Sequence, residues 1–134
     1  MSTTYIDKLA LIALKDRKIL VTLSHGRDKW YIPGGKRESG ESDLQALTRE
    51  VKEELNVDIL PDSLKLYGVF EAQAHGKPEG TIVRMTCYTA RFDGEPVASR
   101  EIEKMDYFTY SQKHLGSLVD HLIFDDLKAK NLID

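Results

Sequence analysis

The sequence predicts an α/β (α+β) fold in which two amphipathic helices pack against the faces of a mixed β-sheet. Apolar residues at helical spacing mark two segments, one ending near residue 57 and one at residues 114–130. Apolar runs separated by glycine, proline and other turn-forming residues indicate strands before and between the helices. A chain of 134 residues suits a single core, so we expect one domain over residues 1–134.

The first strands should form a hairpin that leads to a glycine turn. Residues 5–14 are rich in aliphatic side chains and predict a central strand, with residues 19–23 as its hairpin partner across the polar turn at 15–18. After a loop, residues 30–32 predict a short strand that runs into the turn Pro33-Gly34-Gly35. Glycines in such a turn allow the backbone to approach a ligand closely.

The first helix should bury a narrow apolar stripe. The residues of this stripe fall at i, i+3, i+7 and i+11: Leu44, Leu47, Val51 and Leu55. Candidate N-caps of the helix are Ser39, Ser42 and Asp43.

The second half of the chain predicts three more strands and the second helix. Residues 64–74 and 81–92 indicate two strands joined by a loop rich in helix and strand breakers. A short strand is expected at 105–110, before the helix at 114–130.

Three carboxylates share one face of the first helix. Glu50, Glu53 and Glu54 stand at i, i+3 and i+4, where like charges repel unless solvent or a hard cation separates them. The residues are compatible with an ordinary solvated helix face. The glycine turn ahead of the helix favours a site instead, because a backbone carbonyl there can complete a set of oxygen ligands. Oxygen-only ligands indicate Mg²⁺ or Mn²⁺ rather than zinc.

The stretch from Gly35 to Val57 resembles the signature of the Nudix hydrolases, G-x5-E-x7-R-E-U-x-E-E-x-G-U, in which U is aliphatic. The matching residues are Gly35, Glu41, Arg49, Glu50, Val51, Glu53, Glu54 and Val57. Asn56 replaces the last glycine and is the one departure. We expect it to leave the chemistry intact, because asparagine is the residue after glycine that best adopts the left-handed conformation which ends a helix.

This resemblance implies an αβα sandwich, with the mixed sheet between helices, and a hydrolase that directs water at a phosphorus atom of a nucleoside diphosphate linked to another moiety. It implies that Glu50, Glu53 and Glu54 bind the metal ion together with the carbonyl of Gly35. By the same resemblance Arg49 orients the carboxylates. Glu41 either binds a further cation through water or caps the helix.

The general base and the substrate contacts lie partly outside the signature. Glu101 and Glu103 are the base candidates there, although each also fits an ordinary solvated loop charge. Lys36 is a candidate phosphate contact, and Arg84 is a candidate for phosphate or for a neighbouring carboxylate. Tyr31 and Phe70 either stack on a base or belong to the core.

The approach to the signature, residues 30–36, resembles that of MutT-like enzymes. The resemblance implies a nucleoside triphosphate, canonical or oxidised, that is split into a monophosphate and pyrophosphate. Alternative substrates are ADP-ribose, nucleotide sugars and dinucleoside polyphosphates. An alternative function of a different class is that of a non-catalytic module that senses a nucleotide. Many members of the family pair, so a homodimer is compatible with the resemblance.

Composition excludes several other classes. The formal net charge of −3 offers no basic footprint for duplex nucleic acid and no polybasic membrane patch. One cysteine, Cys87, excludes an internal disulfide, and its strand-like surroundings favour a small buried side chain. The first residues lack the features of a signal peptide, and no apolar run approaches the ~20 residues that span a bilayer, so cytoplasmic residence is the default expectation.

Overall fold

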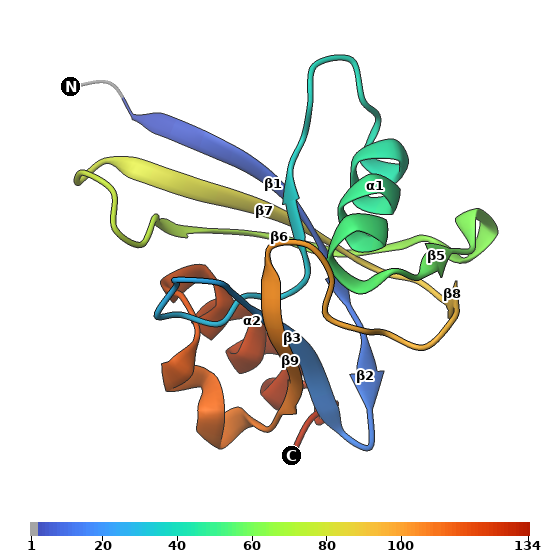
Figure 1. The fold of residues 1–134 in the computed structure, drawn as a ribbon. Coiled ribbons are helices and arrows are strands. Elements are labelled where there is room, and N and C mark those ends of the chain that lie inside the picture. Colours follow the sequence, from blue (N-terminus) through green and yellow to red (C-terminus); the bar gives the residue numbers. More distant parts are fainter. Residues whose placement is uncertain (1–2) are drawn as a thin grey trace.

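A mixed four-stranded sheet forms the centre of the computed structural model, which describes residues 3–134 (Figure 1). Its strand order is β4 (Gly34–Lys36), β1 (Thr4–Ile12), β7 (Thr81–Thr89) and β6 (Lys65–Gln73). Strands β1 and β7 are parallel, whereas β1 with β4 and β6 with β7 are antiparallel. The predicted central position of the first strand is therefore confirmed.

A second sheet crosses the end of the first. It consists of β2 (Leu14–Lys15), β3 (Lys18–Ser24) and β9 (Ile102–Phe108). The predicted hairpin is wrong in its extent, because only Leu14 and Lys15 pair with the start of β3. Both edges of β1 are already occupied by β4 and β7, so β3 takes β9 as its long partner.

The remaining elements are short or helical. Strands β5 (Asp58–Ile59) and β8 (Phe92–Asp93) form a separate pair. The helices are α1 (Asp43–Leu55) and α2 (Leu118–Ala129), with 3₁₀ turns η1 (Pro61–Ser63) and η2 (Tyr110–Leu115). Among residues 3–134, no helix combines the length and the apolar character that crossing a membrane requires.

Helix α1 begins and ends at the residues that its sequence indicates. Ser42 is the N-cap and forms a capping box with Gln45, whereas Asp43 is the first helical residue and Ser39 lies outside. Asn56 closes the helix in the left-handed conformation, with φ of 56°, and donates its N–H to the Lys52 carbonyl. The substitution of asparagine for glycine is thus accommodated as predicted.

Three other boundaries differ from the predictions. The helix expected from residue 114 begins at Leu118, because Gly116 is extended and separates it from η2. The strand expected at 81–92 ends at Thr89 and resumes as β8, and the strand expected at 105–110 is β9, which starts and ends earlier.

The glycine turn is itself a strand, which the sequence did not predict. Residues Gly34–Lys36 form β4, whereas Trp30 and Tyr31 make only isolated bridges instead of the expected strand. Glycine at position 34 permits this pairing, because a Cβ atom there would lie 1.9 Å from the Leu9 carbonyl oxygen. The close approach fixes β4 against β1, and the loop of residues 37–42 connects β4 to α1.

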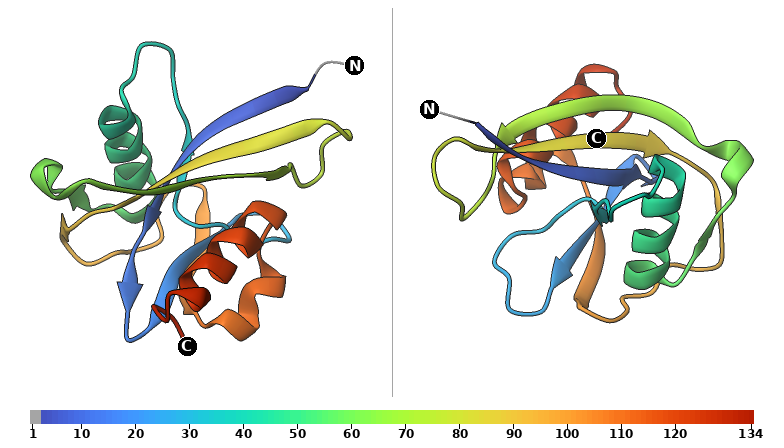
Figure 2. Two further views of the ribbon diagram at one scale, coloured as in Figure 1. Left: turned by 180° about the vertical axis from the view of Figure 1, so that it is seen from behind. Right: turned by 90° about the horizontal axis from the view of Figure 1, so that it is seen from above.

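The four-stranded sheet has a core on each face, as an αβα sandwich requires. Leu9 and Leu11 of β1 pack in the cluster that contains the buried side of α1. Ala10 and Ile12 point to the opposite face and pack in the cluster that contains α2. Figure 2 shows the two helices on different sides of the sheet. The predicted architecture is confirmed, and Cys87 is buried in the α2-facing core.

Candidate active site

Two carboxylates of α1 lie against the backbone of β4. The Gly34 N–H donates to Oε1 of Glu54 at 2.8 Å, so the strand fixes that side chain. At the next position a Cβ atom would lie 2.4 Å from Oε2 of Glu50. A larger residue at position 35 would therefore displace the Glu50 carboxylate, which glycine leaves in contact with the strand.

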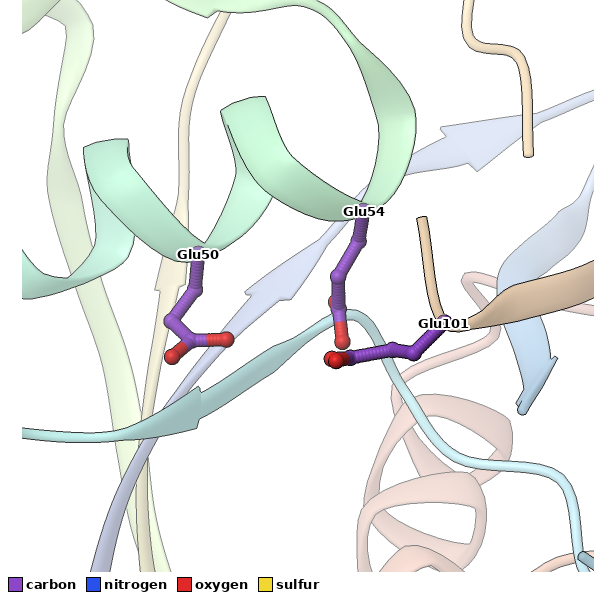
Figure 3. A group of neighbouring side chains, drawn as sticks. All are labelled: Glu50, Glu54 and Glu101. Atoms are coloured by element: carbon purple, nitrogen blue, oxygen red, sulfur yellow. The ribbon is translucent and has the colours of Figure 1, made fainter. Parts of the chain in front are cut away.

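A third carboxylate reaches the same point from the far part of the chain. Carboxylate oxygens of Glu50, Glu54 and Glu101 all lie within 4.8 Å of one another. Figure 3 shows Glu50 and Glu54 descending from the helix, with Glu101 approaching from the segment before β9. Oxygen ligands from three carboxylates suit a hard divalent cation such as Mg²⁺ or Mn²⁺.

The electrostatics of this carboxylate group also favour a cation. Burial raises the pKa of Glu54 to about 8, and the charges of Glu50 and Glu101 act in the same direction. Burial likewise raises the pKa of Glu50, against the opposing effect of Arg49. Carboxylates that resist ionisation because they are buried together gain most from a positive charge placed among them.

Arg49 connects the carboxylate group to the loop before α1. Its Nε and Nη2 donate to the two oxygens of Glu41, each at 2.8 Å, and its Nη1 donates to Oε1 of Glu50 at 2.8 Å. Nη2 also donates to the Lys36 carbonyl at 3.1 Å. These bonds fit the orienting role that the resemblance implies for Arg49. The Arg49 guanidinium lowers the pKa of Glu41 to about 2, so Glu41 stays charged and fastens the loop.

Two predicted acidic residues lie outside the carboxylate group. Glu53 is on the same helix, but its nearest ionic partner is Nη1 of Arg49 at 3.8 Å and its side chain is about one-third exposed. Glu103 is exposed and lies 3.9 Å from His25. Of the two base candidates beyond the signature, the structure thus brings only Glu101 to the carboxylate group.

The carboxylate group forms part of the wall of a cleft of about 390 Å³ between the two sheets. Cationic side chains also line this cleft: Lys8, Arg27, Lys36 and Lys77. Another part of the lining is apolar and comes mainly from β1, β7 and α2: Ile6, Ile32, Val83, Met85 and Val119. The cleft therefore offers carboxylates, cations and an apolar surface to one ligand.

The predicted substrate contacts are divided between the cleft and the outer surface. Lys36 and Tyr31 line the cleft. Arg84 lies outside its lining, forms an ion pair with Glu71 and covers the Tyr5 ring at 4.2 Å. Phe70 also lies outside and stacks with Tyr67, with ring centroids 6.3 Å apart.

Sequence reasoning missed two charged residues near the cleft. Lys8 interrupts a row of apolar residues on β1, and that break in the alternation was the available signal. Asp120 lies in the first turn of α2 and is 1% exposed. Burial raises the pKa of Asp120 to about 7, although Ser117 and Lys8 oppose the shift. The sequence gave no signal for Asp120, because a single acidic residue is ordinary in an amphipathic helix.

Comparisons with known proteins agree with the fold and with the resemblance seen in the sequence. The family model described as NUDIX domain matches residues 7–122. A Bacillus subtilis protein described as the uncharacterized Nudix hydrolase YvcI is 40% identical over 68 residues, which are 50% of this chain and 42% of that protein. The m7GpppN-mRNA hydrolase of Saccharomyces cerevisiae is 30% identical over 95 residues, 71% of this chain and 10% of that protein. The matched part thus spans less than half the length of either relative.

Solved structures show the same fold. The MutT protein of Methanosarcina mazei superposes with a TM-score of 0.75 at 16% identity, and covers 98% of each chain. A MutT Nudix hydrolase from Burkholderia pseudomallei gives 0.72 at 22% identity, over 93% of this chain and 97% of its own. At these identities the likeness extends to the arrangement of strands and helices.

Proposed function

The chain belongs to the Nudix domain family, and we propose that it is a metal-dependent hydrolase of a nucleoside diphosphate linked to another moiety. The observation that carries this proposal is the group of Glu50, Glu54 and Glu101 in the wall of a cleft that also presents cationic side chains. Carboxylates alone would repel a phosphate chain, whereas carboxylates that hold a divalent cation would attract it.

Each residue has a stated task in this proposal, and Glu101 has two. Glu50 and Glu54 hold Mg²⁺ or Mn²⁺, with Glu101 completing the set and the Gly35 carbonyl as a further ligand expected from the resemblance. A bound divalent cation supplies charge neutralisation at a phosphate oxygen and lowers the pKa of a water molecule. Arg49 holds Glu50 in place. Glu101 is exposed and borders the cleft, so we assign it rather than Glu103 to accept a proton from the attacking water.

The cleft supports a nucleoside triphosphate as the substrate, cleaved to a monophosphate and pyrophosphate. Its apolar surface and Tyr31 suit a flat base, and its cationic residues suit a polyphosphate chain. The name of one relative points to nucleotide chemistry as well. A human protein described as 8-oxo-dGDP phosphatase NUDT18 is 47% identical over 38 residues, 28% of this chain and 12% of its own length. Activity in the cytoplasm is part of the same proposal.

The test is phosphate and pyrophosphate release from a panel of nucleotides, with Mg²⁺ and with excess chelator. The panel contains canonical and oxidised triphosphates, ADP-ribose, nucleotide sugars and dinucleoside polyphosphates. We expect turnover of triphosphates that chelator abolishes. Glu54→Gln should reduce it by more than about 100-fold, because it removes a charged ligand. The matched control Glu103→Gln, at an exposed position outside the cleft, should retain activity near that of the wild type.

Two results would contradict parts of the proposal. Chelator-sensitive turnover of ADP-ribose or a nucleotide sugar, without turnover of triphosphates, would contradict the proposed substrate. It would support the proposed metal-dependent hydrolysis. Folded wild-type protein that binds nucleotides but turns over none of the panel with Mg²⁺ or Mn²⁺ would identify a sensing module.

A further inference from the structure

Lys8 stands in an apolar row of the central strand. Side chains of β1 alternate between the faces of the sheet, so Lys8 shares its face with Ile6, Ala10 and Ile12. Ala10 and Ile12 are almost fully buried in the α2-facing core. At Lys8 this row meets the cleft, and the ammonium lies 5.3 Å from the centroid of the Tyr31 ring. A charged side chain at such a position needs a partner.

A second lysine lies directly opposite on the neighbouring strand. The antiparallel register pairs Lys8 of β1 with Lys36 of β4, and both side chains line the cleft. Like charges at directly opposed positions of a ladder destabilise the pair. Arg27 also lines the cleft, and it acts with Lys36 to lower the pKa of Lys8, to which burial contributes most. This part of the cleft therefore concentrates positive charge.

Neither of these two lysines forms an ion pair with a protein carboxylate among residues 3–134. Within the part of the chain that the structure describes, neither Lys8 nor Lys36 has a carboxylate oxygen within 4.0 Å. Asp120 and Glu54 are near enough to raise the pKa of Lys8 but make no ion pair with it. Asp7, the residue before Lys8, pairs with Arg37 instead. The positive charge is left for a ligand.

The same ladder places the two lysines beside the carboxylate group. In the register of β1 with β4, Leu9 and Ala10 face Gly35 and Gly34. These glycines touch the carboxylates of Glu50 and Glu54. An anion held between the two lysines would thus lie one step along the strands from the proposed cation site.

We propose that Lys8 and Lys36 together bind one phosphate group of the substrate. Lys36 lies within the stretch that resembles the family signature, whereas Lys8 lies outside it. The ligand class is a phosphoanhydride chain, in which two ammonium groups contact the oxygens of one phosphate. The inference rests on the proposed function and adds a binding residue to it. It explains why a lysine interrupts the apolar row of β1.

The test is the affinity for inorganic pyrophosphate in excess Mg²⁺, measured by titration calorimetry, because the carboxylate group without a cation would repel this anion. The variants are Lys8→Met and Lys36→Met, with Lys104→Met as the matched control, because Lys104 is an exposed strand lysine outside the cleft. Loss of one charged hydrogen-bond donor should weaken binding at least about tenfold in both cleft variants. Lys104→Met should stay within about twofold of the wild type. Lys8→Gln repeats the measurement with a polar side chain in case the methionine variant folds poorly.

A second measurement separates binding from a structural role. Without ligand, Lys8→Met should melt at the same temperature as the wild type or higher, because it removes a charge that faces Lys36. Pyrophosphate should then raise the melting temperature of the wild type but not that of the variant. Pyrophosphate affinity within twofold of the wild type in a folded Lys8 variant would overturn the inference. These measurements involve binding and no hydrolysis, so their outcome does not depend on the result of the hydrolase assay.

Discussion

At the residue scale, Asp120 is the acid whose burial has the clearest consequence for stability. Its carboxylate oxygens are inaccessible and make no hydrogen bond of normal geometry within residues 3–134. Burial raises its pKa from 3.8 to about 7, so the native protein holds this proton where the unfolded chain has lost it. The contribution of Asp120 to the free energy of unfolding therefore falls as the pH rises from about 4 to about 7, and then levels off.

We predict that Asp120→Asn makes the stability in chelator less dependent on pH over that range. Urea unfolding at several pH values measures the slope. Asp125→Asn is the matched control on the same helix. Lys113 lowers the pKa of Asp125 from 3.8, so Asp125 changes the pH dependence of stability only below pH 3.8. Part of the slope should remain in Asp120→Asn, since the raised pKa of Glu54 acts in the same direction. Equal slopes in the wild type and Asp120→Asn would show that Asp120 is charged in the native state.

The residues of the site were predictable to the extent that they follow one helix. The spacing of Glu50 and Glu54 places them on one face, and both contribute to the carboxylate group. The same spacing suggested Glu53, but the structure leaves it beside Arg49 and outside the group. Glu101 entered the predictions only as one of two nearby acids, because a contact between residues some fifty positions apart depends on how the two sheets cross.

At the element scale, the C-terminus of α1 tests the one departure from the family signature. Asn56 has φ of 56°, a conformation that glycine adopts freely, asparagine tolerates and alanine resists. We predict that Asn56→Gly is neutral or stabilising, whereas Asn56→Ala destabilises by about 1 kcal/mol. Thermal and urea unfolding of the three proteins measures this order. Greater stability of the alanine variant than of the glycine variant would mean that the left-handed cap does not limit the helix.

Elements with a strong local signal were predictable, and those that depend on neighbours were not. Helix α1 has an apolar stripe, a capping box and a left-handed C-cap, and its bounds agree with the sequence. Strand β4 is made of Gly34, Gly35 and Lys36, which have little strand propensity, and it forms because β1 offers an open edge. Helix α2 begins late because Gly116 is extended, a conformation that helical periodicity alone does not reveal.

At the scale of the whole molecule, the carboxylate group joins parts that pack in different layers. Glu50 and Glu54 belong to α1, which covers the four-stranded sheet, whereas Glu101 precedes β9 of the second sheet. A cation bound by all three would connect the two sheets across the cleft. Metal binding would then stabilise the fold as well as the reaction, because the ion binds the native arrangement and not the unfolded chain.

We predict that Mg²⁺ raises the melting temperature of the wild type by several degrees, since a ligand at 100 times its dissociation constant adds about 2.7 kcal/mol. Glu101→Gln should lose most of this gain. Without metal, Glu101→Gln should melt at or above the wild-type temperature, because it removes a charge that disfavours the ionised form of the buried Glu54. Glu103→Gln, two positions along, should behave as the wild type in both conditions. If Mg²⁺ raised the melting temperature of Glu101→Gln as much as that of the wild type, the cation would be bound by α1 alone. Glu101 would then keep only its proposed role as the acceptor of a proton from water.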